Sequence, residues 1–178
     1  MNTNTIKPAD IVFVMHHDNK LSKAIAWFMN SRWSHSAIVA DVTERDVYLH
    51  ETSDTQTKVG MLSRYLNSPG TEVEIWSFNM LSKTEQSAAI SESAKYHDKM
   101  YGYIRLLGAG LRRLLIKIGF KKAPMLLPIG GPLCMMIPHA GLKKIYPQMP
   151  TVGTIDTEEL YKWVKDRAIL KLYKPAEK

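Results

Sequence analysis

Cysteine is the scarcest reactive residue in this chain, because its 178 residues include a single one, Cys134. One cysteine excludes a disulfide within the chain and a metal site built from cysteines alone. Its thiol is therefore either a small buried apolar group or a reactive one.

Long apolar runs are absent too. No stretch reaches the roughly eighteen apolar residues that predict a membrane-spanning helix, and residues 1–8 lack the segments of a signal peptide. We therefore expect a cytoplasmic protein, or one released without a signal peptide. Repeats, low-complexity tracts and long linkers are also missing, so residues 1–178 are predicted to form one domain.

Acidic residues are outnumbered by basic ones, which leaves a net charge of +7. This charge favours an anionic partner such as a cell-wall polymer or a membrane surface. The basic residues form no recognised nucleic-acid motif, so no nucleic-acid partner is predicted. Four histidines lack the spacing to carboxylates that a metal site requires, and we predict neither a metal nor another cofactor; they are His16, His17, His97 and His139.

The chain opens with a strand and a helix. Residues Ile11–Met15 are uniformly apolar, which is typical of a buried strand. Residues Leu21–Met29 predict a helix, because Leu21, Ile25 and Phe28 recur at helical spacing. Asn19 precedes this helix at the position of an N-cap.

A β-hairpin is predicted next, with strands over 35–42 and 46–51 and a polar loop between them. A loop of three residues makes residue i face residue 88 minus i, so odd-numbered residues of both strands share a face. This register brings Glu51 within diagonal reach of His35 and turns His50 away. A slip of one residue would exchange the two, so His50 remains the alternative partner.

The middle of the chain predicts a loop or short helix over 58–65 and a turn at Asn67–Gly70. Residues Thr71–Phe78 alternate polar with apolar, as in a half-buried strand. A capping box at Ser82–Glu85 predicts a helix that continues to about residue 97. Residues 101–120 are apolar and basic together, which favours a core helix with a solvated basic edge; the alternative is peripheral contact of residues 104–120 with an anionic membrane.

The last third begins with a loop over 124–132, rich in proline and glycine, that delivers Cys134. Glycine and proline then divide the chain into a short helix and a loop. Residues 154–163 predict a capped helix, and residues 168–173 predict a final edge strand.

One cysteine and one strand histidine suggest a thiolate–imidazole pair. A thiol at a helix start experiences the positive end of the helix dipole, which favours the reactive thiolate. A neighbouring imidazole strengthens this effect and serves as acid for the leaving group, while a third polar group orients the ring. Cys134, His35 and Glu51 are the candidates for these roles, and the backbone N–H of Cys134 is a natural oxyanion donor.

Six short stretches carry a resemblance to a known family. They are Ala9–Val14, Trp33–Val39, Val47–Thr52, Tyr101–Tyr103, Leu133–Cys134 and Thr154–Leu160. Their order over residues 8–173 resembles the permuted branch of the NlpC-type papain-like superfamily, which includes the YiiX-like proteins and, more distantly, the lecithin:retinol acyltransferase family. In that branch, as here, the histidine precedes the cysteine.

The resemblance implies an α+β, papain-like fold of the circularly permuted NlpC type, in which an antiparallel sheet packs against helices including the cysteine-bearing one. Relatives cleave amide bonds in cell-wall peptides or transfer acyl groups from lipids. Two departures point instead to an inactive member. Met135 and Met136 replace a small hydroxyl residue and an acidic one, and Pro138 is harmless only in the first turn of its helix.

We therefore expect a papain-like cysteine peptidase or amidase that forms an acyl-enzyme at Cys134. Its expected substrates are cell-wall (peptidoglycan) peptides, and no cofactor is expected. His35 is the expected base and acid, and Glu51 the orienting group. The alternatives are a lipid acyltransferase or thioesterase of the same fold, acting on an acyl-lipid, and a catalytically inactive binding module. The oligomeric state is left open by the sequence.

Overall fold

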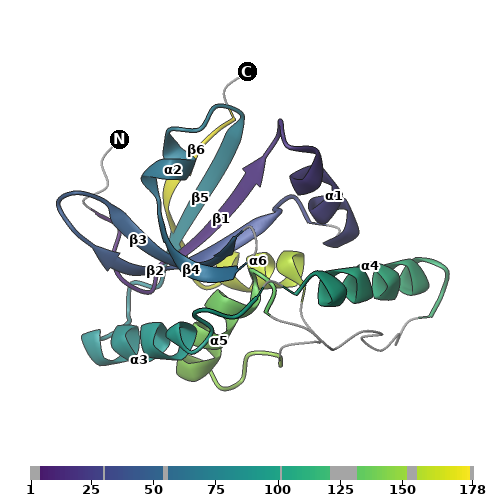
Figure 1. Cartoon of the computed structure of the whole chain (residues 1–178). Helices are drawn as coiled ribbons and strands as arrows, with labels where there is room; N and C mark the ends of the chain where they lie inside the picture. Colours follow the sequence, from purple (N-terminus) through teal and green to yellow (C-terminus); the bar gives the residue numbers. More distant parts are fainter. Residues whose placement is uncertain are drawn as a thin grey trace.

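A computed structural model of the chain describes residues 5–29, 31–53, 56–100, 102–120, 132–151 and 156–176. Figure 1 shows a twisted sheet with α3, α5 and α6 below it and α4 extending to one side. In chain order the elements are β1 (Ile11–His16), α1 (Lys20–Met29), β2 (His35–Val42), β3 (Val47–Ser53), β4 (Gln56–Met61), α2 (Ser63–Leu66), β5 (Thr71–Ser77), α3 (Lys83–Ala94), α4 (Tyr103–Lys117), α5 (Met136–Ile145), α6 (Thr157–Lys165) and β6 (Ile169–Lys174).

The six strands form one antiparallel sheet in the order β4-β3-β2-β1-β5-β6. This arrangement confirms the predicted α+β class, with an antiparallel sheet packed against helices. Strands β1 to β4 are neighbours in chain order, with α1 between β1 and β2 and hairpins joining β2, β3 and β4, whereas β5 returns to the free edge of β1. The predicted edge position of the last strand is also confirmed, because β6 pairs only with β5.

Side chains of β1 alternate between two apolar cores, one on each face of the sheet. Ile11 and Phe13 pack with residues of α5 and α6, while Val12 and Val14 pack on the other face with Tyr65 of α2. A strand that is buried on both faces has no side that is exposed to solvent, which explains the uniformly apolar run at 11–15.

The predicted register of the first hairpin is confirmed where it matters for His35. Ile38 pairs with His50 and Val39 with Leu49, so that paired residue numbers sum to 88 as expected. A β-bulge between Val39 and Asp41 then shifts the outer part of the hairpin by one residue. The bulge compensates for a connection that is one residue longer than predicted, since β2 ends at residue 42 and β3 begins at residue 47.

The segment 58–65 differs in part from the prediction, because β4 covers its first half and the short helix α2 covers its end. In β4 only Thr57 and Gly60 are buried, and neither is a strongly strand-forming apolar residue. An edge strand that buries so little lacks the alternation by which strands are recognised. The sequence therefore concealed the fourth strand, whereas the short helix after it was one of the two predicted alternatives.

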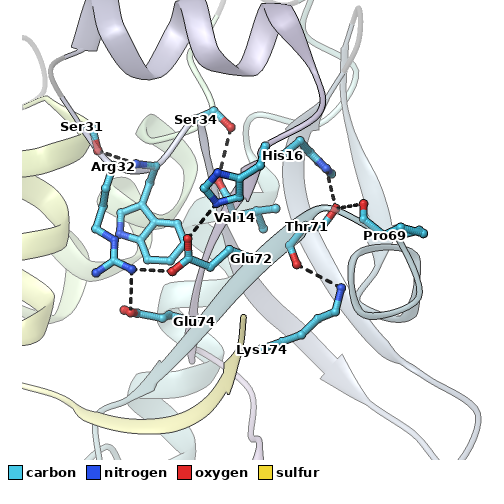
Figure 2. A network of polar contacts seen from close by, with 12 residues as sticks. Val14, His16, Ser31, Arg32, Ser34, Pro69, Thr71, Glu72, Glu74 and Lys174 are labelled. Carbon is cyan, nitrogen blue, oxygen red and sulfur yellow. Dashed lines mark hydrogen bonds and ion pairs between the residues drawn. The ribbon is translucent and has the colours of Figure 1, made fainter. Parts of the chain in front are cut away.

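Strand β5 is buried along its whole length, whereas its alternating pattern predicted a half-buried strand. Its two glutamates are covered by Arg32, whose Nη2 lies 2.5 Å from Glu72 Oε1 and 3.6 Å from Glu74 Oε1. Figure 2 shows this ion-pair network beside the contact between Lys174 and the Thr71 carbonyl oxygen. Arg32 thereby attaches the segment between α1 and β2 to the face of β5.

Helix caps are confirmed at two predicted sites. Asn19 Oδ1 accepts hydrogen bonds from the backbone of Leu21 and Ser22, and Ser82 forms a capping box with Glu85. The buried face of α1 differs from the predicted one, because Leu21 is exposed. The buried positions of α1 are Ser22, Ala26 and Met29, which recur at spacings of four and three on one face of the helix.

The prediction of a core helix over 101–120 is wrong. The apolar residues of α4 that were expected in the core are largely exposed, and Leu106 alone of the described ones packs partly against it. Gly110 lies against Phe28 of α1, at a distance where a Cβ atom would be 2.5 Å from the ring. The contact face of α4 is thus narrow and glycine-lined, and it leaves the leucines on the opposite side uncovered.

Some predicted features involve residues that the structure does not describe. The loop over 124–131, Tyr101, and residues Thr154 and Ile155 of the last predicted helix lie outside the described residues. The rest of that helix is α6, capped by Asp156 and Glu159. Over the part of the chain that the structure covers, no helix is long and apolar enough to cross a membrane.

Helices α3 and α5 pack closely at Gly141, where an added Cβ would lie 2.9 Å from the Ala89 carbonyl oxygen and from Ile38 Cδ1. We predict that Gly141→Ala lowers the free energy of unfolding by about 1–3 kcal/mol, because the backbone of α3 must shift. Urea denaturation measures this change. A glycine-to-alanine change in a helix otherwise stabilises by about 1 kcal/mol, so a gain in stability would contradict the close contact. Ser87→Ala, on the exposed side of α3, is the control.

Candidate active site

Cys134 lies in a turn directly before α5, and it is 4% exposed. The turn is closed by hydrogen bonds from the backbone N–H of Met136 to the Leu133 carbonyl (2.9 Å) and from Ile137 to the Cys134 carbonyl (3.4 Å). The predicted placement of the cysteine at the start of a helix is therefore confirmed. A residue at this position lies next to the unpaired N–H groups of the first helical turn, where the helix dipole is positive.

Pro138 is the third residue of α5. The N–H groups of the first turn have no partner within a helix, so a proline there removes no hydrogen bond. This position meets the condition under which Pro138 leaves the helix start undisturbed. Met135 stands at the N-cap without a side-chain cap, and Met136 Sδ instead accepts from the Leu133 N–H at 3.3 Å.

His35 is the first residue of β2, and its side chain is 12% exposed. Its ring hydrogen-bonds the side chain of Cys134 on one side and Glu51 on the other. Because Nε2 makes the bond to Glu51 Oε2 (2.9 Å), Nδ1 is the nitrogen that faces the thiol. Cys134 Sγ also lies 3.8 Å from the carbonyl oxygen of Ser34. Folding thus brings together a cysteine and a histidine about a hundred residues apart.

Glu51 of β3 is completely buried, and three side chains donate hydrogen bonds to it. Its Oε2 accepts from His35 and from the Tyr65 hydroxyl (2.5 Å), and its Oε1 accepts from Arg64 Nη2 (2.7 Å). Arg64 Nη2 also donates to the Tyr65 hydroxyl at 2.7 Å. A buried carboxylate needs such partners, because burial without them would favour its neutral form.

These contacts shift the pKa values of both partners. Burial alone would lower the pKa of His35, but its hydrogen bonds and charge interactions with Cys134 and Glu51 outweigh burial and raise it to about 10. Burial alone would raise the pKa of Glu51, but the bond to His35 and the nearby Tyr65 and Arg64 hold it below its ordinary value. At neutral pH the pair is therefore an imidazolium beside a carboxylate.

The alternative partner, His50, lies elsewhere. Its Nδ1 is 2.7 Å from Ser93 Oγ of α3, and its ring is 4.3 Å from that of His97. Burial and the neighbouring His97 lower the pKa of His50 to about 4, so it is neutral at physiological pH. The structure brings Glu51 and not His50 to His35.

Sequence reasoning missed Arg64 and Tyr65, because the segment that holds them was not recognised as α2 after a fourth strand. It also missed Gly60 of β4, where a Cβ atom would fall 2.0 Å from Glu51 Oε1. An arginine next to a tyrosine carries no recognisable motif. The glycine within a short polar stretch was the available signal, since glycine in a strand often marks a close approach.

His16 was assigned to surface or local packing, and the structure places it at the edge of the site. Its Nδ1 lies 2.9 Å from Thr71 Oγ1, and its ring centroid is 5.6 Å from that of Tyr65. Partial burial and the positive charges of His35 and Arg64 lower the pKa of His16. This lowering favours the neutral form of the His16 ring beside the protonated His35.

A metal does not fit this arrangement. Among the described residues, no group of three or more histidine, cysteine, aspartate or glutamate side chains is placed to hold a metal ion. Both oxygens of Glu51 already accept hydrogen bonds, and both ring nitrogens of His35 are engaged. The chemistry that this site offers is that of a thiol, an imidazole and a carboxylate.

The pKa of His35 is predicted to fall when the thiol is removed. In Cys134→Ala the ring loses the interactions with the thiol group that raise its pKa, while Glu51 remains. NMR titration of the His35 ring protons measures the midpoint, which should lie near pH 10 in the wild type. Because His35 keeps its proton longer in the folded than in the unfolded chain, the free energy of unfolding should also fall as pH rises from about 6.5 to about 10. An unchanged midpoint in Cys134→Ala would show that the two groups do not interact.

Gly60→Ala is predicted to displace Glu51, at a cost of about 1–3 kcal/mol in the free energy of unfolding. A double-mutant cycle tests the cause: in a Glu51→Ala background the clash is gone, and Gly60→Ala should then change stability by less than about 0.5 kcal/mol. Denaturant titration of the four proteins gives the coupling. Equal costs in both backgrounds would mean that Gly60 serves the strand and not the carboxylate.

No family model matches the chain, and no curated protein matches it. Among solved structures it resembles the crystal structure described as metalloprotein yiiX from Escherichia coli O157:H7, with a TM-score of 0.54 and 14% sequence identity over 93% of this chain and 96% of that one. The chain therefore has a YiiX-like fold over nearly its whole length.

Proposed function

We propose that this protein is a papain-like cysteine hydrolase of the circularly permuted NlpC type, which cleaves an amide bond through an acyl-enzyme at Cys134. The observation that carries the proposal is the position of the His35 ring, with one nitrogen on the thiol and the other on the buried carboxylate of Glu51. Cysteine nucleophiles are recognised by this order of nucleophile, base and orienting group.

The proposed reaction starts from a thiolate beside the protonated His35. The sulfur attacks the carbonyl carbon, and the backbone N–H of Cys134 donates to the oxyanion. His35 Nδ1 then gives its proton to the leaving amine, which departs as the C–N bond breaks. The neutral imidazole takes a proton from water, whose oxygen attacks the thioester and releases the acid and the thiolate.

Glu51 has the role of an orienting group in this scheme. Its hydrogen bond holds the Nε2–H of His35, so that Nδ1 always faces the sulfur. Arg64 and Tyr65 stabilise its negative charge, which makes transfer of a proton from His35 to Glu51 unfavourable. Glu51 thus fixes the ring and stabilises the imidazolium without changing its own protonation.

Cell-wall peptides are the substrate class that we propose first, because the net charge of +7 suits an anionic polymer and relatives in the resembling superfamily cleave such peptides. A second candidate is acyl transfer from a lipid or hydrolysis of a thioester. It is favoured by the exposed apolar side of α4, whose preceding residue Gly102 donates to the carbonyl of Pro132, two residues before Cys134.

Activity profiling tests the proposal with peptidoglycan fragments and acyl esters in parallel. Cys134→Ala and His35→Ala are predicted to lower kcat/KM by at least about a thousandfold on the true substrate, and Glu51→Gln by less, because the nucleophile and the imidazole both remain. His17→Ala is the matched control, since His17 contacts Glu72 on β5 and not the thiol. Comparable loss in His17→Ala would indicate general damage to the fold.

Alkylation of the thiol decides whether the site is instead an inactive binding module, as Met135 and Met136 would favour. Iodoacetamide is predicted to label Cys134 at least about tenfold more slowly in His35→Ala than in the wild type, because the thiolate is the reactive form and the imidazole takes up its proton. With 4% of Cys134 exposed, the same rate reports whether a reagent reaches the sulfur. Equal, slow labelling in both proteins would contradict catalysis.

A further inference from the structure

The exposed side of α4 is apolar along its whole length. Five residues at spacings of three and four lie on it, each between 39% and 71% exposed; they are Ile104, Leu107, Leu111, Leu114 and Ile118. Such spacing places their side chains on one face of the helix. Contiguous apolar surface of this kind is rare on an isolated soluble domain and marks a contact with something else.

Helix α1 widens this surface. Trp27 is 60% exposed, and the Nζ atom of Lys117 lies 5.5 Å from the centre of its ring, so the indole sits beside the end of α4. Figure 1 shows both helices together at one side of the sheet, away from α3. Trp27 and the five residues of α4 form a surface that we call the α1–α4 face. A tryptophan with a lysine at its edge suits the boundary between water and lipid.

The stretch of sequence that includes α4 carries charge of one sign. From Lys99 to Ile155 the sequence has nine lysines and arginines and not one aspartate or glutamate, although the whole chain has 17 acidic residues. Lys117 is an exposed member of this set on α4 itself, and Lys121 and Lys122 come four and five residues later in the sequence. The basic surplus of the protein is thus concentrated in the segment that carries the apolar surface.

We infer that the α1–α4 face docks on the surface of an anionic lipid membrane, with α4 lying in the plane of the interface. Apolar residues with a basic border bind such membranes by burial in the lipid and by attraction to its headgroups. A second copy of this chain is a poorer occupant, because facing copies would bring equal positive charges together. With 15 residues α4 is too short to span a bilayer.

Docking in this way would hold the reactive thiol near the membrane. The backbone N–H of Gly102, just before α4, donates to the carbonyl of Pro132 at 3.1 Å, and Cys134 follows two residues later. The inference rests on the surface and not on the proposed chemistry. It would serve a lipid ester or a cell-wall peptide held close to the membrane.

Vesicle flotation of the full chain tests the inference, with phosphatidylcholine vesicles that contain or lack phosphatidylglycerol. Binding is expected only to the anionic vesicles and should weaken with added NaCl. Leu107→Gln/Ile118→Gln should lower the partition coefficient at least about tenfold. The matched control is Leu170→Gln/Ile169→Gln, which changes the same residue types at exposed positions of β6 and should leave binding unchanged. Lys117→Gln should lower it about fivefold and Lys171→Gln little.

Three results would overturn the inference: no binding to either vesicle, equal binding of the α4 double variant and its control, or equal binding with and without the anionic lipid. Size-exclusion chromatography with light scattering gives a fourth, because a dimer that dissociates in Leu107→Gln/Ile118→Gln would make this face a contact between copies. Cys134→Ala should float like the wild type. Vesicle binding therefore tests the membrane inference independently of the proposed thiol chemistry.

Discussion

The buried charge of Glu51 is the constraint on which the candidate site depends. An ionised carboxylate without exposure to water is tolerated only when each oxygen has donors, and here His35, Tyr65 and Arg64 supply them. The donors come from β2 and α2, so the charge ties a strand and a helix to β3. Because the same carboxylate orients the imidazole, the demand for charge compensation and the geometry of the thiol–imidazole pair are met by one set of hydrogen bonds.

Neighbouring residues without reactive groups also contribute to the geometry of the site. Gly60 leaves the volume that Glu51 Oε1 occupies, and Pro138 stands where the first turn of α5 needs no donor. On the other side of the strand, His50 remains neutral against Ser93, which keeps a second positive charge away from the sheet. The geometry of the site therefore depends on the missing side chain of Gly60, the missing N–H group of Pro138 and the neutral ring of His50, as well as on its own polar side chains.

Strand parity made much of the site predictable from sequence. Side chains alternate with a period of two, so the pairing of Ile38 with His50 was enough to place Glu51 and His35 on one face. Strand β4 was not predictable, because an edge strand buries few side chains and leaves little pattern. The exposure of α4 was not predictable for a different reason. The sequence shows that a helix is amphipathic, but only the tertiary structure shows whether its apolar side packs against the rest of the protein or stays exposed.

The β-bulge after Val39 has a consequence for how this hairpin tolerates change. It separates the loop over 43–46 from the pairing near the site, since the mismatch of one residue is absorbed at Ala40 before it reaches Ile38. An insertion or deletion in this loop can be accommodated if a β-bulge in the hairpin is gained, lost or moved. The distal end of the hairpin is thus free to diversify in length among descendants of this chain, while the histidine and the glutamate keep their phase.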